Sequence, residues 1–197
     1  VVPVVDGRMV NDDLLSHGEV LVEDDHVRAR QVAVQLALAR AVEEFGVSRI
    51  ITFHTNVNSA AGFVAEGAEG VHNHLPGFST YHVNGTQRTA DREDQLRAFA
   101  EANKGLITNA RCLTEGVDVP AVDMVAFVAP RRSKIDIVQA TGRAMRKAGP
   151  DKECGYILLP LFLEQDEGET LEDALERSQF EEVAAVLNAM QEQDEEL

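Results

Sequence analysis

The chain has 197 residues, of which 44% are hydrophobic and 26% charged, with 34 Asp and Glu against 18 Lys and Arg. This length fits one large domain or a domain with an appendage, and the composition excludes a disordered chain. No apolar run reaches the roughly 18–20 residues of a membrane helix, and the first residues lack a signal-peptide pattern. Cys112 and Cys154 form no CxxC or zinc spacing, so we expect a reduced, cytoplasmic protein. Because the sequence opens on Val1 instead of Met, we expect a piece of a longer protein.

The net charge of −16 is unevenly distributed. Residues 161–197 hold 13 acidic residues and one basic residue, whereas residues 128–148 hold six basic residues and one acid. We therefore predict two parts, a main domain over residues 1–160 and an acidic, solvated helical extension over residues 161–197. The global charge argues against non-specific nucleic-acid binding by this chain alone, but it leaves room for a local phosphate site.

Strands and helices are predicted to alternate along the chain. Apolar runs predict strands at residues 1–5, 49–53, 79–83, 105–109, 124–128 and 155–160. Helical spacing and capping patterns predict helices after Asp24 and Asp25 up to Gly46, over residues 57–68, after Thr89 as the N-cap, after Ser133, and after Thr170. Because several strands are apolar throughout, we expect an α/β fold in three layers, with a mainly parallel sheet covered on both faces.

Three polar segments follow predicted strands, where ligands of open α/β sheets bind. They are FHTNVNSA from Phe53, NARCLTEGVDVP from Asn109, and the helix QATGRAMR from Gln139. In the helix, Arg143 and Arg146 lie three residues apart on one face, and Gln139 shares that face. Two guanidinium groups on one face suit phosphate oxygens. For an isolated pair, an amphipathic helix with solvated arginines would be the simpler interpretation, but Gly142 costs roughly 1 kcal/mol of helix propensity and calls for a compensating role.

These segments resemble the motifs of superfamily 2 helicases and translocases. QATGRAMR resembles motif VI (QxxGRxxR), NARCLTEGVDVP resembles motif V, and IITFHTN from Ile50 is similar to motif IV. YHVNGTQ from Tyr81, with the downstream Arg92, Leu96 and Phe99, resembles the segment between motifs IV and V. The order is that of the family, and the likeness covers about residues 49–160. It is closest to the DEAD/DEAH-like and restriction-enzyme motor branch, and it implies a RecA-like (P-loop NTPase-type) fold and the second motor domain.

The resemblance also implies roles for residues that bind nucleotide. Arg143 and Arg146 match the arginine fingers, and Gln139 matches a residue near the γ-phosphate. Three further residues would border the nucleotide: Gly116, Asp118 and Gly142.

For the nucleic-acid backbone, the resemblance implies contacts from Thr55, Asn109 and Ala110. Ala110 stands where the family usually has Thr, so a hydroxyl contact at that position is not expected.

The sequence contains no GxxxxGK[ST] motif and no DExx-type acidic box. In such motors both belong to the first RecA-like domain, which would bind most of the ATP and its Mg²⁺. The expected partners are therefore that N-terminal domain and nucleic acid, DNA in preference to RNA. The function expected is that of an ATP-dependent helicase or translocase, inactive as this fragment, with a restriction-modification motor as one candidate.

Two alternatives remain at this stage. One is a non-catalytic RecA-like module that binds protein or nucleic acid; the other is a Rossmann-like cofactor enzyme, against which the absence of GxGxxG argues. His72 and His74, with His54 and His82 nearby in the sequence, lack the further ligands of a usual metal site, so no metal is predicted.

Overall fold

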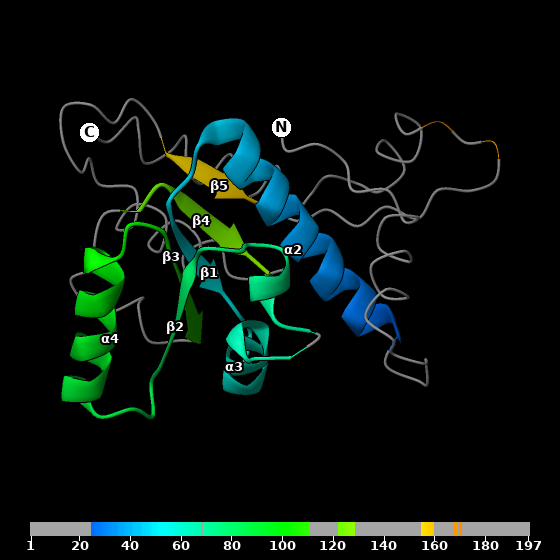
Figure 1. Ribbon diagram of the computed structural model, residues 1–197. Helices are drawn as coiled ribbons and strands as arrows, with labels where there is room; N and C mark the ends of the chain where they lie inside the picture. Colours follow the sequence, from blue (N-terminus) through cyan, green and yellow to red (C-terminus); the bar gives the residue numbers. More distant parts are fainter. Residues whose placement is uncertain are drawn as a thin grey trace, which may run out of the picture.

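The computed structural model describes residues 25–67, 69–110, 122–128 and 155–159, with residues 168 and 170. In this part of the chain, strands form a parallel sheet in the order β2-β3-β1-β4-β5 (Figure 1). The strands are β1 (Arg49–Phe53), β2 (Ser79–Asn84), β3 (Gly105–Ala110), β4 (Met124–Phe127) and β5 (Tyr156–Leu158). The helices are α2 (Asp25–Phe45), α3 (Val57–Val64), the 3₁₀ turn η1 (Val71–Asn73) and α4 (Thr89–Glu101). The predicted parallel α/β architecture is thereby confirmed.

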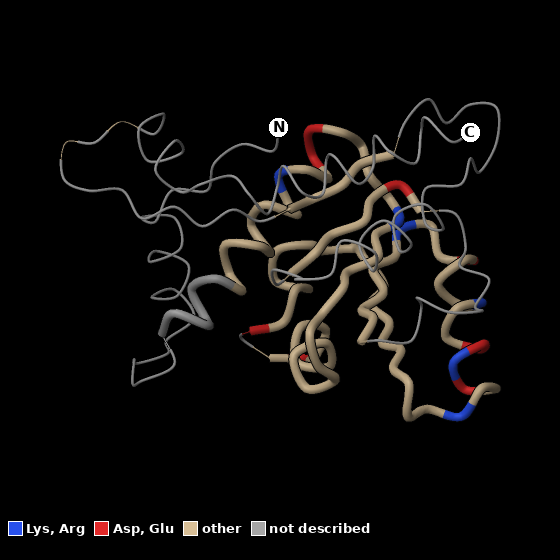
Figure 2. Tube along the Cα trace, turned by 180° about the vertical axis from the view of Figure 1, so that it is seen from behind, with Lys and Arg blue, Asp and Glu red and all other residues tan. Residues whose placement is uncertain are grey.

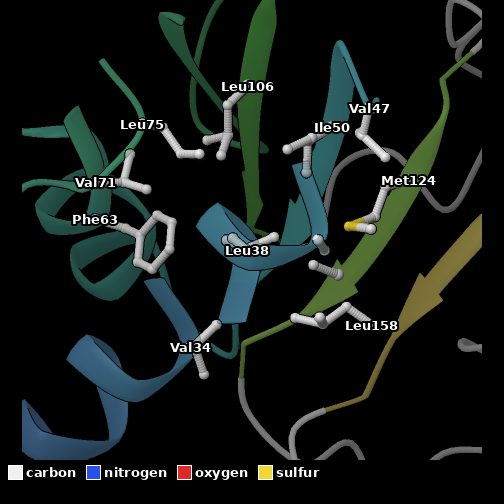
Figure 3. Packing of buried hydrophobic residues seen from close by; sticks show 12 residues of the cluster. Val34, Leu38, Val47, Ile50, Phe63, Val71, Leu75, Leu106, Met124 and Leu158 are labelled. Atoms are coloured by element: carbon white, nitrogen blue, oxygen red, sulfur yellow. The ribbon is translucent and has the colours of Figure 1, made fainter. Parts of the chain in front are cut away.

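Two apolar clusters cover the two faces of the sheet. On one face, α2, α3 and η1 pack over Ile50, Leu106 and Met124, as Figure 3 shows. On the other face, Leu96 and Phe99 of α4 pack over the alternate residues of the same strands. All four residues of β4 and all six of β3 are buried, because both faces of these strands are covered.

Helix α2 follows the predicted apolar face. Val34, Leu38 and Ala41 are buried against the sheet, and Gly46 follows with a φ of +65°. The amide of Gly46 donates to the carbonyl of Val42 at 3.0 Å, which closes the helix in the left-handed conformation expected of glycine. No helix in the described ranges is long and apolar enough to cross a membrane.

Two helix boundaries differ from the prediction. Helix α4 begins one residue earlier than predicted, with Arg88 and not Thr89 as its N-cap. The preceding turn is held by hydrogen bonds of the Asn84 and Gln87 side chains instead of a helix cap. The Arg88 guanidinium forms a paired contact with Asp91 at 2.7 Å. Helix α3 ends at Val64 instead of continuing to residue 68, since Ala65 adopts an extended conformation.

The amino ends of the central strands are joined by one carboxylate. An Asp123 oxygen accepts hydrogen bonds from the amides of Ser48 (3.0 Å) and Arg49 (2.9 Å) and from the Ser48 hydroxyl (3.2 Å). The amide of Asp123 donates to the Arg49 carbonyl, and its carbonyl accepts from Tyr156. Asp123 thus connects β1, β4 and β5 at the edge opposite the candidate site.

Several predicted elements fall outside the described residues. They are the strand at residues 1–5, the cap at Asp24, the helix after Ser133, the helix after Thr170 and the boundary between residues 160 and 161.

Candidate functional site

The carboxyl ends of β1, β3 and β2 lie next to one another in the sheet. Phe53 of β1 pairs with Asn109 of β3, and Asn84 of β2 pairs with Ala110. The segment after β1 carries Thr55, so the structure places the three predicted nucleic-acid residues, Thr55, Asn109 and Ala110, at one edge of the sheet. In parallel α/β sheets this is the edge where ligands bind.

These three residues differ in exposure. Thr55 is exposed, whereas Asn109 is fully buried and Ala110 is 2% exposed. The carbonyl of Asn109 accepts a hydrogen bond from the amide of His54 at 3.0 Å, which fixes the start of the loop that bears Thr55. Thr55 can therefore present its side chain to a ligand directly, while Asn109 supports the loop from below.

The remaining predicted site residues lie outside the described part of the chain. These are Gly116, Asp118, Gln139, Gly142, Arg143 and Arg146. Their nucleotide-binding roles stay predictions.

A buried polar row crosses the sheet on the α3 face just before this edge. Thr52 of β1 and His82 of β2 both pair with Thr108 of β3, so the three side chains stand at one level of the sheet. Thr52 and Thr108 are fully buried, and the ring of His82 is half-buried. Buried polar groups require hydrogen-bond partners, and each member of the row has one.

The hydrogen bonds around His82 define its protonation. The amide N–H of Thr86 can only donate, and it donates to Oδ1 of Asn84 at 2.9 Å, so Nδ2 of Asn84 is the atom 3.0 Å from Nε2 of His82. Nε2 must accept this bond, which leaves the proton on Nδ1, 2.8 Å from the hydroxyl of Thr108. The Thr108 hydroxyl in turn donates to the Tyr81 carbonyl at 3.4 Å. Burial lowers the pKa of His82 below its ordinary value, in agreement with a neutral ring.

The turn between β2 and α4 depends on the same side chains. Gln87 accepts from the amide of Asn84 at 3.0 Å and donates to the carbonyl of His82 at 3.2 Å. The hydroxyl of Thr86 donates to Oδ1 of Asn84 at 2.7 Å. Gly85 and Thr86 are exposed at the tip of the turn, so a ligand can approach its backbone.

The loop between β1 and α3 has a comparable network. His54 is 1% exposed, and its ring nitrogens lie 3.0 Å from the Thr52 hydroxyl and 3.3 Å from the Ser59 hydroxyl. Asn56 caps α3 by accepting from the amide of Ser59 at 2.8 Å. This network orders the backbone around the exposed Thr55.

In the described loops after β1 and β2, the electrostatics come from the backbone more than from charged side chains. The loops after β1 and β2 carry no charged residue before Arg88, whereas Figure 2 shows acidic and basic residues side by side along α4. Helices α3 and α4 both begin at this edge, and the positive ends of their dipoles favour anions there. Hydroxyl, amide and backbone N–H groups of this kind contact phosphates without reading base sequence.

Sequence reasoning missed the polar row. The sequence analysis considered His54 and His82 only as candidate metal ligands. Within the described ranges, no three His, Cys, Asp or Glu side chains gather closely enough to hold a metal ion. The available signal was a pair of polar residues two apart at the end of an apolar strand. Thr52 with His54 and His82 with Asn84 both follow this pattern, and residues two apart share a face of a strand.

The described strands and helices define a parallel α/β domain with a polar carboxyl edge, and the comparisons identify its family. Residues 33–148 match the family described as the helicase conserved C-terminal domain, so the chain belongs to it.

Two relatives with curated descriptions carry helicase names. The Saccharomyces cerevisiae protein IRC3, named as an ATP-dependent helicase, is 25% identical over 81 residues, which cover 41% of this chain and 12% of that protein. A protein of African swine fever virus, named as a helicase, is 27% identical over 158 residues, 78% of this chain and 17% of that protein. This chain thus spans less than a fifth of the length of either relative.

Solved structures give the same fold. An ATP-dependent Type ISP restriction-modification enzyme, LlaBIII, bound to DNA, matches with a TM-score of 0.63 and 26% identity, over 94% of this chain and 13% of that one. Domain 2 of a DEAD-box helicase bound to an RNA duplex matches with a TM-score of 0.52 and 15% identity, over 66% of this chain and 49% of that one. The predicted RecA-like fold and the resemblance to the second domain of these motors are confirmed.

Proposed function

We propose that this chain is the second motor domain of an ATP-dependent helicase or translocase that acts on nucleic acid. The observation that carries the proposal is the family match over residues 33–148, which includes the QATGRAMR segment with both arginines. The likeness to a DNA-bound restriction-modification enzyme over 94% of the chain favours DNA over RNA and a restriction-modification motor.

In this proposal the carboxyl edge is the nucleic-acid track. The exposed hydroxyl of Thr55 donates to a backbone phosphate, supported by the N-terminus of α3 a few residues further on. Asn109 and Ala110, whose side chains are buried, contribute through the backbone and by holding the loops. Hydroxyl and backbone N–H groups contact phosphates without reading base sequence, which suits a translocating motor.

The nucleotide lies between this domain and the first motor domain, which provides most of the contacts to ATP and Mg²⁺. Arg143 and Arg146 reach the phosphates when the two domains close and stabilise the charge that develops during phosphoryl transfer. Gln139 lies near the γ-phosphate, and the backbone at Gly116 and Gly142 allows close approach.

Asp118 completes this side of the nucleotide site. Its carboxylate holds the ribose or orients one of the two arginine fingers. Closing and reopening of the cleft then shifts the grip on the nucleic acid.

The test is nucleic-acid-stimulated ATPase activity of the parent protein, wild type beside Arg143→Ala. We expect duplex DNA to stimulate the wild type and the variant to lose roughly 10³-fold in turnover, as for arginine fingers elsewhere. Arg97→Ala is the matched control, since the Arg97 side chain is 68% exposed on α4 and pairs only weakly with Asp94 at 3.4 Å. A loss of less than about tenfold in Arg143→Ala would contradict the finger assignment.

The same assay separates the motor from its alternatives. No turnover of the folded wild type with single- or double-stranded DNA or RNA would favour a binding module that has lost its motor function. Stronger stimulation by duplex RNA than by duplex DNA would overturn the DNA preference.

A further inference from the structure

The relay Thr108–His82–Asn84 joins two strands to an exposed turn. It runs from β3 through the His82 ring to Asn84, the last residue of β2, and then to the amide and hydroxyl of Thr86. Every step is a side-chain hydrogen bond of 2.7 to 3.0 Å, and the direction of each is fixed by the Thr86 amide. The conformation of the turn therefore depends on a neutral His82 ring.

We propose that His82 is a positioning residue for the nucleic-acid track: as a neutral ring it holds the Gly85–Thr86 turn at the end of β2, and its protonation releases this turn and weakens binding of duplex DNA. The proposal rests on the proposed function, because it takes the carboxyl edge to be the track. It adds the Gly85–Thr86 turn to that track, two strands away in the sheet from the loop that carries Thr55. It also makes DNA binding depend on pH.

Protonation acts on one bond. A proton on Nε2 turns this atom into a donor that faces the Nδ2 donor of Asn84, so the two N–H groups oppose each other. Asn84 cannot rotate its amide to relieve the clash without losing the bonds from Thr86, since Oδ1 accepts both of them. The turn must then move, and with it the start of α4, whose N-cap Arg88 makes no side-chain capping hydrogen bond.

No other described group on this face competes for the proton. On the face of the sheet that carries His82, β2 lies beside β3 and under α3, and neither element contains an ionisable side chain. His54 on the same face bonds Thr52 and Ser59 instead. Glu66 and Glu69 lie in the loop after α3, outside both elements. Arg88, the N-cap of α4, is exposed in the turn and pairs with Asp91. Helix α4 packs on the opposite face of the sheet, and its charged residues are Asp91, Arg92, Glu93, Asp94, Arg97 and Glu101.

The sign of the pH effect follows from the lowered pKa. The unfolded chain takes up the proton on His82 at a higher pH than the folded chain does. Folding stability from this site is therefore complete above the ordinary histidine value of 6.5 and falls as the pH drops below it. We expect DNA affinity to fall as well when the pH drops towards the lower pKa of His82 in the folded chain.

The experiment measures binding of a fluorescein-labelled DNA duplex to the parent protein between about pH 5.5 and 8, where histidines titrate. For the wild type we expect about fivefold weaker binding at the acidic end, the equivalent of one hydrogen bond. In His82→Gln the ring is gone, and the side-chain carbonyl can accept from Asn84 at every pH, so this drop disappears. His72→Gln, in η1 at the opposite end of β2, is the matched control and keeps the wild-type profile.

Asn84→Asp tests the same bond from the other side. The carboxylate still accepts from Thr86, but its second oxygen now faces Nε2 and favours the protonated ring. This variant is expected to keep its affinity at acidic pH relative to its own value at pH 8, unlike the wild type. A purely structural role of His82 predicts no such opposite response.

ATPase assays add a second readout. Protonation of His82 is expected to raise the DNA concentration that gives half-maximal stimulation and to leave turnover at saturating DNA unchanged. If the wild type binds DNA and all variants share its pH profile, the relay proposal is wrong and the proposed function stands. If the wild type binds no duplex DNA at any pH, the relay proposal fails together with the proposed DNA preference, and the proposed motor function is then decided by the ATPase assay.

Discussion

Ala110 ends β3 where the family usually carries Thr, and the structure explains the smaller residue. Its side chain is 2% exposed, and it pairs in the sheet with Asn84, the last residue of the Thr108–His82–Asn84 relay. A threonine would add two atoms to this buried position. We expect Ala110→Thr to lower the free energy of unfolding by about 1–3 kcal/mol, the usual cost of overpacking, and to gain no DNA affinity.

Urea unfolding of the chain measures this change, with Ala98→Thr on the exposed face of α4 as the control. There only helix propensity changes, so a loss of about 0.5 kcal/mol is expected. Unchanged stability of Ala110→Thr together with tighter DNA binding would show that the site accepts the family's hydroxyl, against the packing argument.

At the scale of elements, Asp123 aligns three strands at the amino edge. One carboxylate oxygen receives three hydrogen bonds, two of them from backbone amides of the β1 start that would otherwise lose their partner. Hydrogen bonds to a charged group contribute about 1.5–3 kcal/mol. We expect Asp123→Ala to destabilise the chain by about 2–3 kcal/mol and Asp123→Asn, which keeps an acceptor, by clearly less.

The shift of the urea midpoint at constant slope reports this loss. Asp94→Ala is the matched control, because Asp94 is 72% exposed and its pair with Arg97 is long, so a change within about 0.5 kcal/mol is expected. If both variants behave alike, Asp123 is no more than a surface acid.

The elements also show what sequence could and could not predict. The spacing of Val34, Leu38 and Ala41 predicted the buried face of α2, and apolar runs predicted five strands within a residue or two, because burial on both faces leaves a strong pattern. The start of α4 was wrong by one residue, since the side chains of Asn84 and Gln87 and not a helix cap organise the preceding turn.

At the scale of the whole molecule, the site was only half predictable. Motif resemblance placed Thr55, Asn109 and Ala110 at one edge, but it could not show that Asn109 is buried and Thr55 exposed, because exposure depends on the sheet order β2-β3-β1. The relay through His82 depends on the pairing of β2 with β3, residues 26 apart in sequence. Such a contact has no local signature.

The last prediction concerns what this chain does alone. Its sequence has no GxxxxGK[ST] loop and no acidic DExx box, the parts that hold the phosphates, Mg²⁺ and the attacking water in such motors. Arginines that act across a domain cleft stabilise a transition state that the partner domain must assemble. We therefore expect the purified 197-residue chain to show no DNA-stimulated ATP turnover above background and no unwinding, at the concentrations at which the parent protein is assayed.

The control is Arg143→Ala, assayed both in the parent protein and in the isolated 197-residue chain. In the parent protein we expect the substitution to lower turnover roughly 10³-fold, and in the isolated chain to change nothing, because there is no activity to lose. Turnover by the isolated chain that disappears in Arg143→Ala would mean that one domain, or a dimer of it, forms a complete active site. The division of labour between two motor domains would then be wrong for this protein, even though its fold is the one the family shares.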